Sequence, residues 1–75
     1  MALEVVGGVT YLYVADEIHG RILKFNAATG VRVSTFGETG TGDGQFNRPF
    51  GVAVDPVTHD LYIAERGNHR VQRVT

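Results

Sequence analysis

Residues 60–74 read DLYIAERGNHRVQRV, and residues 11–25 read YLYVADEIHGRILKF, so the chain contains two copies of one unit. The two copies align at a constant offset of 49 residues. The aligned pairs include Leu12 with Leu61, Asp16 with Glu65, Arg21 with Arg70 and, upstream, Leu3 with Val52 and Val5 with Val54. A repeat of about fifty residues lies in the range of propeller and solenoid proteins.

The rhythm within each copy is that of β-strands. Short runs rich in β-branched and aromatic residues alternate with Gly, Asn and Asp-Pro turn signals. No segment sustains a helical period. We expect four strands in the first copy and three in the second, at residues 3–6, 11–16, 21–26 and 31–36, and then at 51–55, 60–65 and 70–75.

The strands differ in how they distribute apolar residues. Residues 11–15, YLYVA, are apolar on both faces, whereas residues 70–74, RVQRV, alternate as half-exposed strands do. A gradient from buried to exposed strands is typical of a four-stranded antiparallel sheet that packs radially around an axis. Such sheets are the blades of a β-propeller.

The second copy resembles an NHL repeat. The resemblance rests on residues 40–74, which read GTGDGQFNRPFGVAVDPVTHDLYIAERGNHRVQRV and include the Asn68-His69-Arg70 triplet. The first copy is similar but has His19 and Gly20 where the triplet has Asn68 and His69. The resemblance implies a β-propeller, most often of six blades, that serves mostly to bind RNA or protein, with some enzymes among the members.

This resemblance divides the chain into three parts. We expect a first NHL-like blade at residues 1–36, a Gly-rich connection at 37–50, and a second NHL-like blade at 51–75 that lacks its fourth strand.

Two blades are too few to close a ring, because propellers have about four to eight. Such a chain should expose apolar blade faces and unpaired strand edges, and head-to-tail contact between identical chains closes a ring. We therefore expect a homotrimer with six blades, with four-bladed dimers or eight-bladed tetramers as alternatives. The open outer position of the second blade either stays exposed, with Arg70 and Arg73 opposing edge pairing, or accepts residues 2–8 of a neighbour; the first is favoured.

Acidic and basic residues repeat at equivalent places. Asp16 and Glu65 end the second strand of each copy, and Arg21 and Arg70 begin the third. These groups either form a charged ring on one face of the propeller or an ion pair within each blade. The repetition favours the structural ion pair, because a catalytic site needs an asymmetry that identical units supply poorly.

The connection supplies aromatic side chains. We expect Phe46 and Phe50 to pack between the blades, with Pro49 fixing the start of the inner strand. The glycines of residues 37–44 resemble a phosphate-binding loop, but the Gly-Lys-Ser/Thr ending of that motif is absent.

The sequence predicts no catalytic residue, metal or cofactor. His19, His59 and His69 are too scattered for a zinc site. A ring of Glu4 and Asp55 carboxylates would offer oxygen ligands to Ca²⁺, but Asp55 lies in a typical turn sequence. A nucleophile motif of the GxSxG type is absent.

The composition limits the partners. The net charge of −1 and the absence of cysteine give no electrostatic bias toward nucleic acid and no disulfide. No signal peptide or membrane-spanning run is seen, so we expect a soluble chain without a membrane partner; its localisation is not predicted.

We predict a non-enzymatic fragment of an NHL-type propeller that assembles with itself into a closed ring, and its two-blade length favours an engineered or excised origin. The alternative is a module that binds protein, or less readily RNA, through the top face of the propeller. The contacting residues would be Arg48, Arg66, Asn68 and His69.

Overall fold

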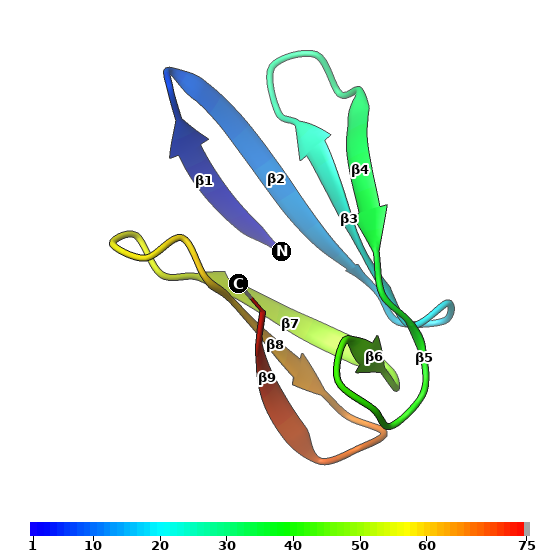
Figure 1. Cartoon of the computed structure of the whole chain (residues 1–75). Coiled ribbons are helices and arrows are strands. Elements are labelled where there is room, and N and C mark those ends of the chain that lie inside the picture. The colour runs from blue at the N-terminus through cyan, green and yellow to red at the C-terminus, as the bar shows by residue number, and fades with distance from the viewer. Residues whose placement is uncertain (75) are drawn as a thin grey trace.

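A computed structural model describes residues 1–74; Thr75, the last residue of the strand predicted at 70–75, lies outside the described residues. Figure 1 shows two antiparallel sheets stacked one above the other and joined by a looped connection on one side. The prediction of an all-β fold made of antiparallel sheets is confirmed.

The first sheet is a four-stranded antiparallel meander in chain order. Its strands are β1 (Ala2–Val6), β2 (Val9–Asp16), β3 (Arg21–Asn26) and β4 (Arg32–Phe36). Gly7 and Gly8 form the tight turn between β1 and β2 with φ angles of 57° and 80°. Residues with a Cβ atom rarely adopt this left-handed backbone conformation, so the two glycines allow the chain to reverse direction within two residues.

The second sheet has three strands, β7 (Pro49–Val54), β8 (Leu61–Glu65) and β9 (Arg70–Val74). Within residues 1–74 no strand pairs with the outer edge of β9. The turn between β7 and β8 is closed by Asp55, whose carboxylate accepts hydrogen bonds from the backbone N of Val57 (2.8 Å) and of Thr58 (3.3 Å). These two donors lower the pKa of Asp55, which therefore serves its own turn.

The register of the two sheets corrects one part of the sequence alignment. Leu12 pairs with Leu3 in the first sheet, whereas the aligned Leu61 pairs with Val54 in the second. The first strands are thus offset by 51 residues, and the alignment of Leu3 with Val52 is wrong. Nine positions separate Leu3 from Leu12, whereas seven separate Val54 from Leu61, so the second hairpin is two residues shorter between equivalent positions. Because the shift is two, every side chain keeps its face.

The connection at residues 37–50 is more ordered than the sequence indicates. It contains β5 (Glu38–Thr39) and β6 (Gln45–Phe46), which pair in parallel, and β7 begins at Pro49. Phe46 is fully buried and meets Phe36 edge-on, with ring centroids 6.4 Å apart. Gly37, at φ 94°, passes so close to the Phe46 ring that a Cβ would lie 2.5 Å from it. Only glycine fits at this position.

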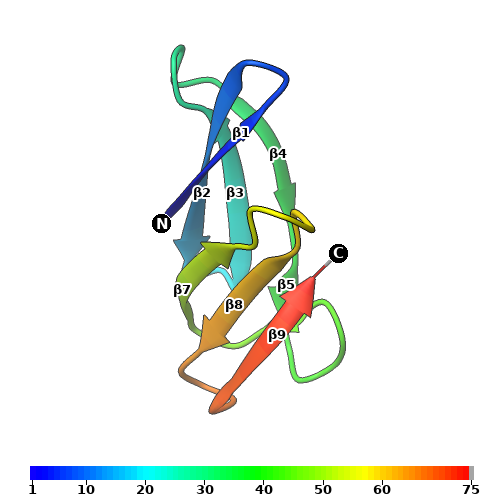
Figure 2. The same ribbon diagram turned by 90° about the vertical axis from the view of Figure 1, so that its left-hand side faces the viewer.

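The core lies between the two sheets. The strand order is β1-β2-β3-β4 in the first sheet and β7-β8-β9 in the second, and Figure 2 shows β4 and β9 on the same side. The buried hydrophobic residues come from both sheets and the connection: Tyr13, Ile22, Phe46, Val52, Leu61 and Ile63. Each sheet therefore has one face in the core and one face that no other sheet covers within the described residues.

Phe50 departs from the expectation that it packs between the sheets. It is 52% exposed, because the β-bulge between Pro49 and Gly51 interrupts the alternation that would otherwise place it on the same face as the buried Val52. The guanidinium of Arg66 lies 5.1 Å from the centroid of the Phe50 ring and partly shields it. The predicted core role of Phe50 is therefore wrong for this chain, whereas Phe46 does lie in the core.

Candidate binding surface

Two equivalent ion pairs close the β2–β3 and β8–β9 hairpins. The Nε atom of Arg21 lies 2.8 Å from Asp16 Oδ2, and that of Arg70 lies 2.7 Å from Glu65 Oε2. In each sheet the two residues are direct cross-strand partners at the end of the ladder. The acidic and basic groups are thus paired within each hairpin.

The pair in the second sheet also holds the connection. The terminal nitrogens of Arg70 donate to the backbone carbonyls of Thr41 (2.8 Å), Gly42 (3.1 Å) and Gln45 (2.9 Å). Glu65 Oε1 accepts a hydrogen bond from the backbone N of Asn47 at 3.0 Å. The side chains of Gln72 and Asn68 donate to Glu65 as well, at 2.9 and 2.8 Å.

This set of donors governs the charge of Glu65. Burial works to raise the pKa of its carboxyl, but the hydrogen bonds from Arg70, Gln72, Asn47 and Asn68 outweigh it and lower the pKa to about 2. Glu65 is therefore a buried, ionised carboxylate whose lone pairs are all directed at structural partners.

The pair in the first sheet has fewer partners. Arg21 donates only to Asp16 among the described residues, and Asp16 also accepts from the backbone N and the Nδ1 of His19. The hydrogen bond from Arg21 is the main cause that lowers the pKa of Asp16 to about 2. A carboxylate and an arginine thus close a hairpin in both sheets, but the pair fixes a loop in only one.

The structure sets Asn68 apart from the other three residues expected to contact a partner. The backbone of Arg48 and that of Arg66 are joined, since Arg66 N donates to Arg48 O at 2.9 Å. His69 lies on the exposed β8–β9 turn at φ 50°. Asn68 points inward and donates to Gly40 O and Glu65, so it is a structural residue here rather than the contacting residue that the sequence predicts.

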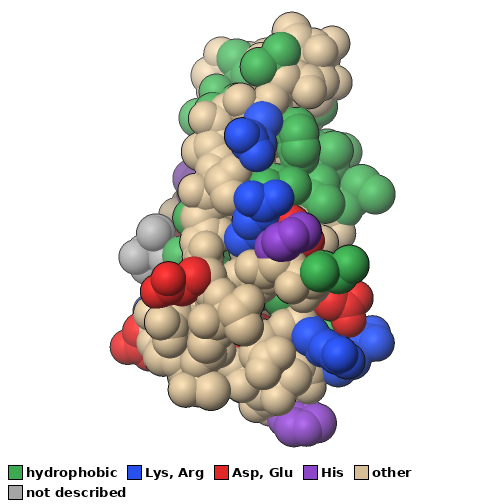
Figure 3. Space-filling model, turned by 90° about the vertical axis from the view of Figure 1, so that its right-hand side faces the viewer, with side chains coloured by type: hydrophobic (Ala, Val, Ile, Leu, Met, Phe, Trp, Pro, Cys, Tyr) green, Lys and Arg blue, Asp and Glu red, His purple; other side chains and the backbone are tan. Residues whose placement is uncertain are grey.

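A surface cavity of about 380 Å³ lies next to Arg48, between the β2–β3 turn and the connection. We call its lining the turn surface: Glu17, Ile18, Thr39, Asn47 and Arg48. Ile18 is 88% exposed, and Glu17 lies 3.8 Å from Arg66. Ile18 is not among the contact residues predicted from the sequence, although an aliphatic residue within a short charged turn is a recognisable signal. In Figure 3 charged side chains and histidines occupy the lower half of this side of the molecule.

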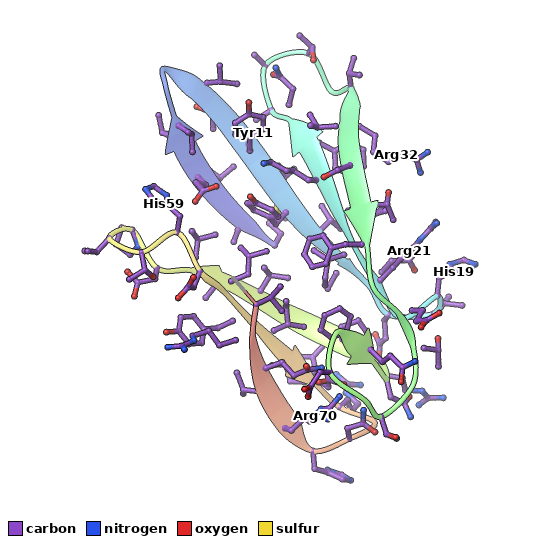
Figure 4. All side chains as sticks on the ribbon, viewed as in Figure 1. Tyr11, His19, Arg21, Arg32, His59 and Arg70 are labelled. Carbon is purple, nitrogen blue, oxygen red and sulfur yellow. The ribbon has the colours of Figure 1, made fainter. Side chains whose placement is uncertain are left out.

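A second polar cluster joins the two sheets at their other end. Glu4, buried on β1, accepts hydrogen bonds from the hydroxyl of Tyr13 (3.0 Å) and from Nδ1 of His59 (2.8 Å). Figure 4 shows His59 reaching from the β7–β8 turn toward β1. Burial and the bond to Glu4 raise the pKa of Tyr13 to about 12. The pKa of Glu4 is lowered, because these bonds outweigh its burial.

The histidines lie at three separate places: His19 with Asp16, His59 with Glu4, and His69 on its turn. In the part of the chain that the structure describes, no three His, Asp or Glu side chains converge into a group able to hold a metal ion. The described residues also form no helix that could cross a membrane.

Residues 46–74 match the family model described as NHL repeat. This match supports the assignment of the segment to an NHL repeat. The matched segment runs from Phe46 to the end of β9, so it contains the Glu65–Arg70 pair and Asn68, the residues that hold the connection.

NHL repeats are blades of β-propellers, and they generally act as non-enzymatic scaffolds that mediate protein interactions. The antiparallel sheets of this chain are consistent with a β-propeller fragment. The matched repeat is therefore consistent with a protein-binding role.

Proposed function

We propose that this chain is a non-enzymatic NHL-type propeller fragment that assembles with copies of itself into a closed ring. In this proposal β1 to β4 form one blade, β7 to β9 form a second blade without its outer strand, and residues 37–50 connect them. The two-blade length would then reflect an engineered or excised origin.

The observation that carries the proposal is a difference in exposure between equivalent residues. Tyr13 and Ile22 face the second sheet and are 6% and 0% exposed. Their equivalents Tyr62 and Val71 lie on the open face of the second sheet and are 37% and 64% exposed. The same apolar pattern is thus covered in one sheet and bare in the other.

The opposite faces show the complementary difference. Leu61 and Ile63 are buried against the first sheet, whereas the open face of the first sheet carries Leu3, which is 63% exposed, and Val5. Figure 3 shows hydrophobic side chains gathered over the upper half of the molecule, at the level of the β1–β4 sheet. Exposed apolar surface of this kind is typical of interaction sites.

These two open faces complement each other as the two covered faces do. The β7–β9 face of one copy would pack on the β1–β4 face of the next, in the arrangement seen within the chain. Such a head-to-tail contact joins two different surfaces. It forms a ring when the rotation from one copy to the next adds up to a full turn. Three copies would supply six blades, within the range of known propellers.

The test is the molar mass in solution, measured by size-exclusion chromatography with light scattering at two concentrations. We expect three times the chain mass of 8.1 kDa at both. Twice or four times that mass at both concentrations would support a ring of four or eight blades. A monomer at both concentrations, or a molar mass that keeps increasing with concentration, would overturn the proposal of a closed ring.

A second candidate function is protein binding through the turn surface. It is favoured by the exposure of Ile18 beside Arg48 in a surface cavity, which combines an apolar contact with a cation. The net charge of −1 disfavours RNA. A photo-crosslinking residue placed at Ile18 should capture a defined protein that the same residue at Val57 does not; equal capture at both positions would exclude this site.

A further inference from the structure

The open face of the β7–β9 sheet carries a cavity of about 530 Å³. It lies at the end of the sheet near the β8–β9 turn. Its apolar lining comes from Phe50, Ala64 and Val71, and Arg66 and His69 lie around them together with the Glu65–Arg70 pair. Neither the ion pairs nor the turn surface uses the apolar part of this cavity.

The first sheet shows what fits at the equivalent place. Ala64 pairs with Val71 across β8 and β9, as Ala15 pairs with Ile22 across β2 and β3. Ile22 belongs to the same buried cluster as Phe46, and Ala15 packs against that cluster. Phe36, the cross-strand partner of Ile22, meets the Phe46 ring edge-on. An aromatic ring therefore fills this position on the first sheet.

On the second sheet the same floor is bare. Val71 is 64% exposed where Ile22 is fully buried, and no aromatic residue of the described chain lies over it in the manner of Phe46. Arg66 already lies over the ring of Phe50 at the edge of the cavity, 5.1 Å from its centroid. An apolar floor with the Arg66 guanidinium at the rim suits an aromatic side chain, which gains both burial and cation–π attraction.

We propose that this cavity is a binding site for a partner's aromatic side chain, presented by an extended segment. His69 stands at the position of Gly20. A Cβ at Gly20 would lie 2.7 Å from the carbonyl oxygen of Phe46. A segment bound at the second sheet must therefore lie farther from that sheet than residues 45–47 lie from the first sheet. Tryptophan and tyrosine fit best, because their side chains are longer than that of phenylalanine.

The site goes beyond self-assembly and does not depend on it, because a single chain contains the whole cavity. It is also compatible with a ring, since Phe46 occupies the equivalent place while the second sheet packs beside it.

The probe is N-acetyl-tryptophanamide, titrated into the ¹⁵N-labelled chain and followed by two-dimensional NMR, with N-acetyl-leucinamide as the aliphatic control. We expect saturable shifts confined to the amides of residues 64–71 and to the residues beside Phe50. The leucine compound should bind about tenfold more weakly, because it lacks the ring.

Two substitutions locate the site. Val71→Asp places a carboxylate on the apolar floor and should weaken tryptophanamide binding at least tenfold, whereas Val57→Asp, on the exposed β7–β8 turn, should leave it unchanged. Ala64→Leu, which fills the floor without adding charge, should also block binding. Shifts spread over the whole surface, equal binding of both compounds, or full binding by Val71→Asp would each overturn the proposal.

Discussion

The guanidinium of Arg70 binds Glu65 across the end of a hairpin and, with the same group, binds three carbonyls of the loop that precedes its own sheet. The equivalent Arg21 closes its hairpin but binds no loop within the described residues. The Asp16–Arg21 pair therefore closes only its hairpin, whereas the Glu65–Arg70 pair closes its hairpin and also holds the loop.

The first prediction follows from this difference. Glu65→Gln should lower the free energy of unfolding by about 2–4 kcal/mol, because it leaves the Arg70 charge and several buried donors without their carboxylate. Asp16→Asn should lower it less, since Asp16 is partly exposed and has fewer partners. Urea denaturation of both variants checks this. Equal losses would contradict the assignment of the loop contacts to Glu65.

A second prediction concerns acid. The pKa values of Asp16 and Glu65 are about 2 in the folded chain, below the ordinary values of 3.8 and 4.5. A carboxyl with a lowered folded pKa stabilises the fold above its unfolded pKa, and this contribution is lost as the pH falls toward the folded value. Stability should therefore decrease between about pH 4.5 and 2, and the decrease should be smaller in Glu65→Gln. Urea midpoints across this range provide the measurement; an unchanged pH slope in the variant would contradict it.

Much of the fold follows from local sequence. Period-two apolar patterns with glycine and Asp-Pro turns specify strands, and the repeat at residues 11–25 and 60–74 specifies two similar sheets. The pairing of Asp16 with Arg21 follows from their position beside a turn, where strand ends meet. These features depend on neighbours along the chain, which the sequence displays directly.

The register of the first strands does not follow from local sequence. Leu3 and Val54 occupy equivalent positions because the second hairpin is two residues shorter between its paired positions, and an alignment without gaps hides this difference. The exposure of Phe50 likewise depends on the β-bulge between Pro49 and Gly51. The bond from His59 to Glu4 joins residues 55 positions apart and requires the packing of the two sheets.

The third prediction separates the two phenylalanines of the connection. Phe46→Ala should destabilise the chain by about 3–5 kcal/mol, because it removes a fully buried ring between the sheets. Phe50→Ala should cost less than about 1 kcal/mol, since it removes an exposed ring and its contact with Arg66. Thermal and urea unfolding give both values. A large loss in Phe50→Ala would mean that this ring is buried in solution, most simply by a second copy.

The fourth prediction tests the polar contact between the sheets. Tyr13→Phe should destabilise the chain by about 1 kcal/mol, because it removes a hydrogen bond to the buried Glu4 carboxylate. His59→Ala should have a smaller effect, because His59 is half exposed. The two residues bind different oxygens of Glu4, so the double variant should lose more than either single variant. Unfolding of all three variants measures this, and an unaltered stability in Tyr13→Phe would contradict the contact.

The last prediction concerns the way copies join. Leu3→Asp places a charge on the open face of the first sheet, and Tyr62→Asp places one on the open face of the second. Burying an unpaired carboxylate is costly, so each variant alone should be monomeric. Val57→Asp, on an exposed turn, should assemble as the unchanged chain does.

Mixing the two monomeric variants distinguishes a head-to-tail contact from a symmetric one. The Leu3→Asp chain keeps an intact β7–β9 face, and the Tyr62→Asp chain keeps an intact β1–β4 face. A head-to-tail contact predicts one productive interface between them, and hence a species of two chains and no larger ring. Light scattering of the separate and mixed samples measures this. If the mixture stays monomeric, or if either variant alone forms dimers, the two faces do not bind each other as they do within the chain.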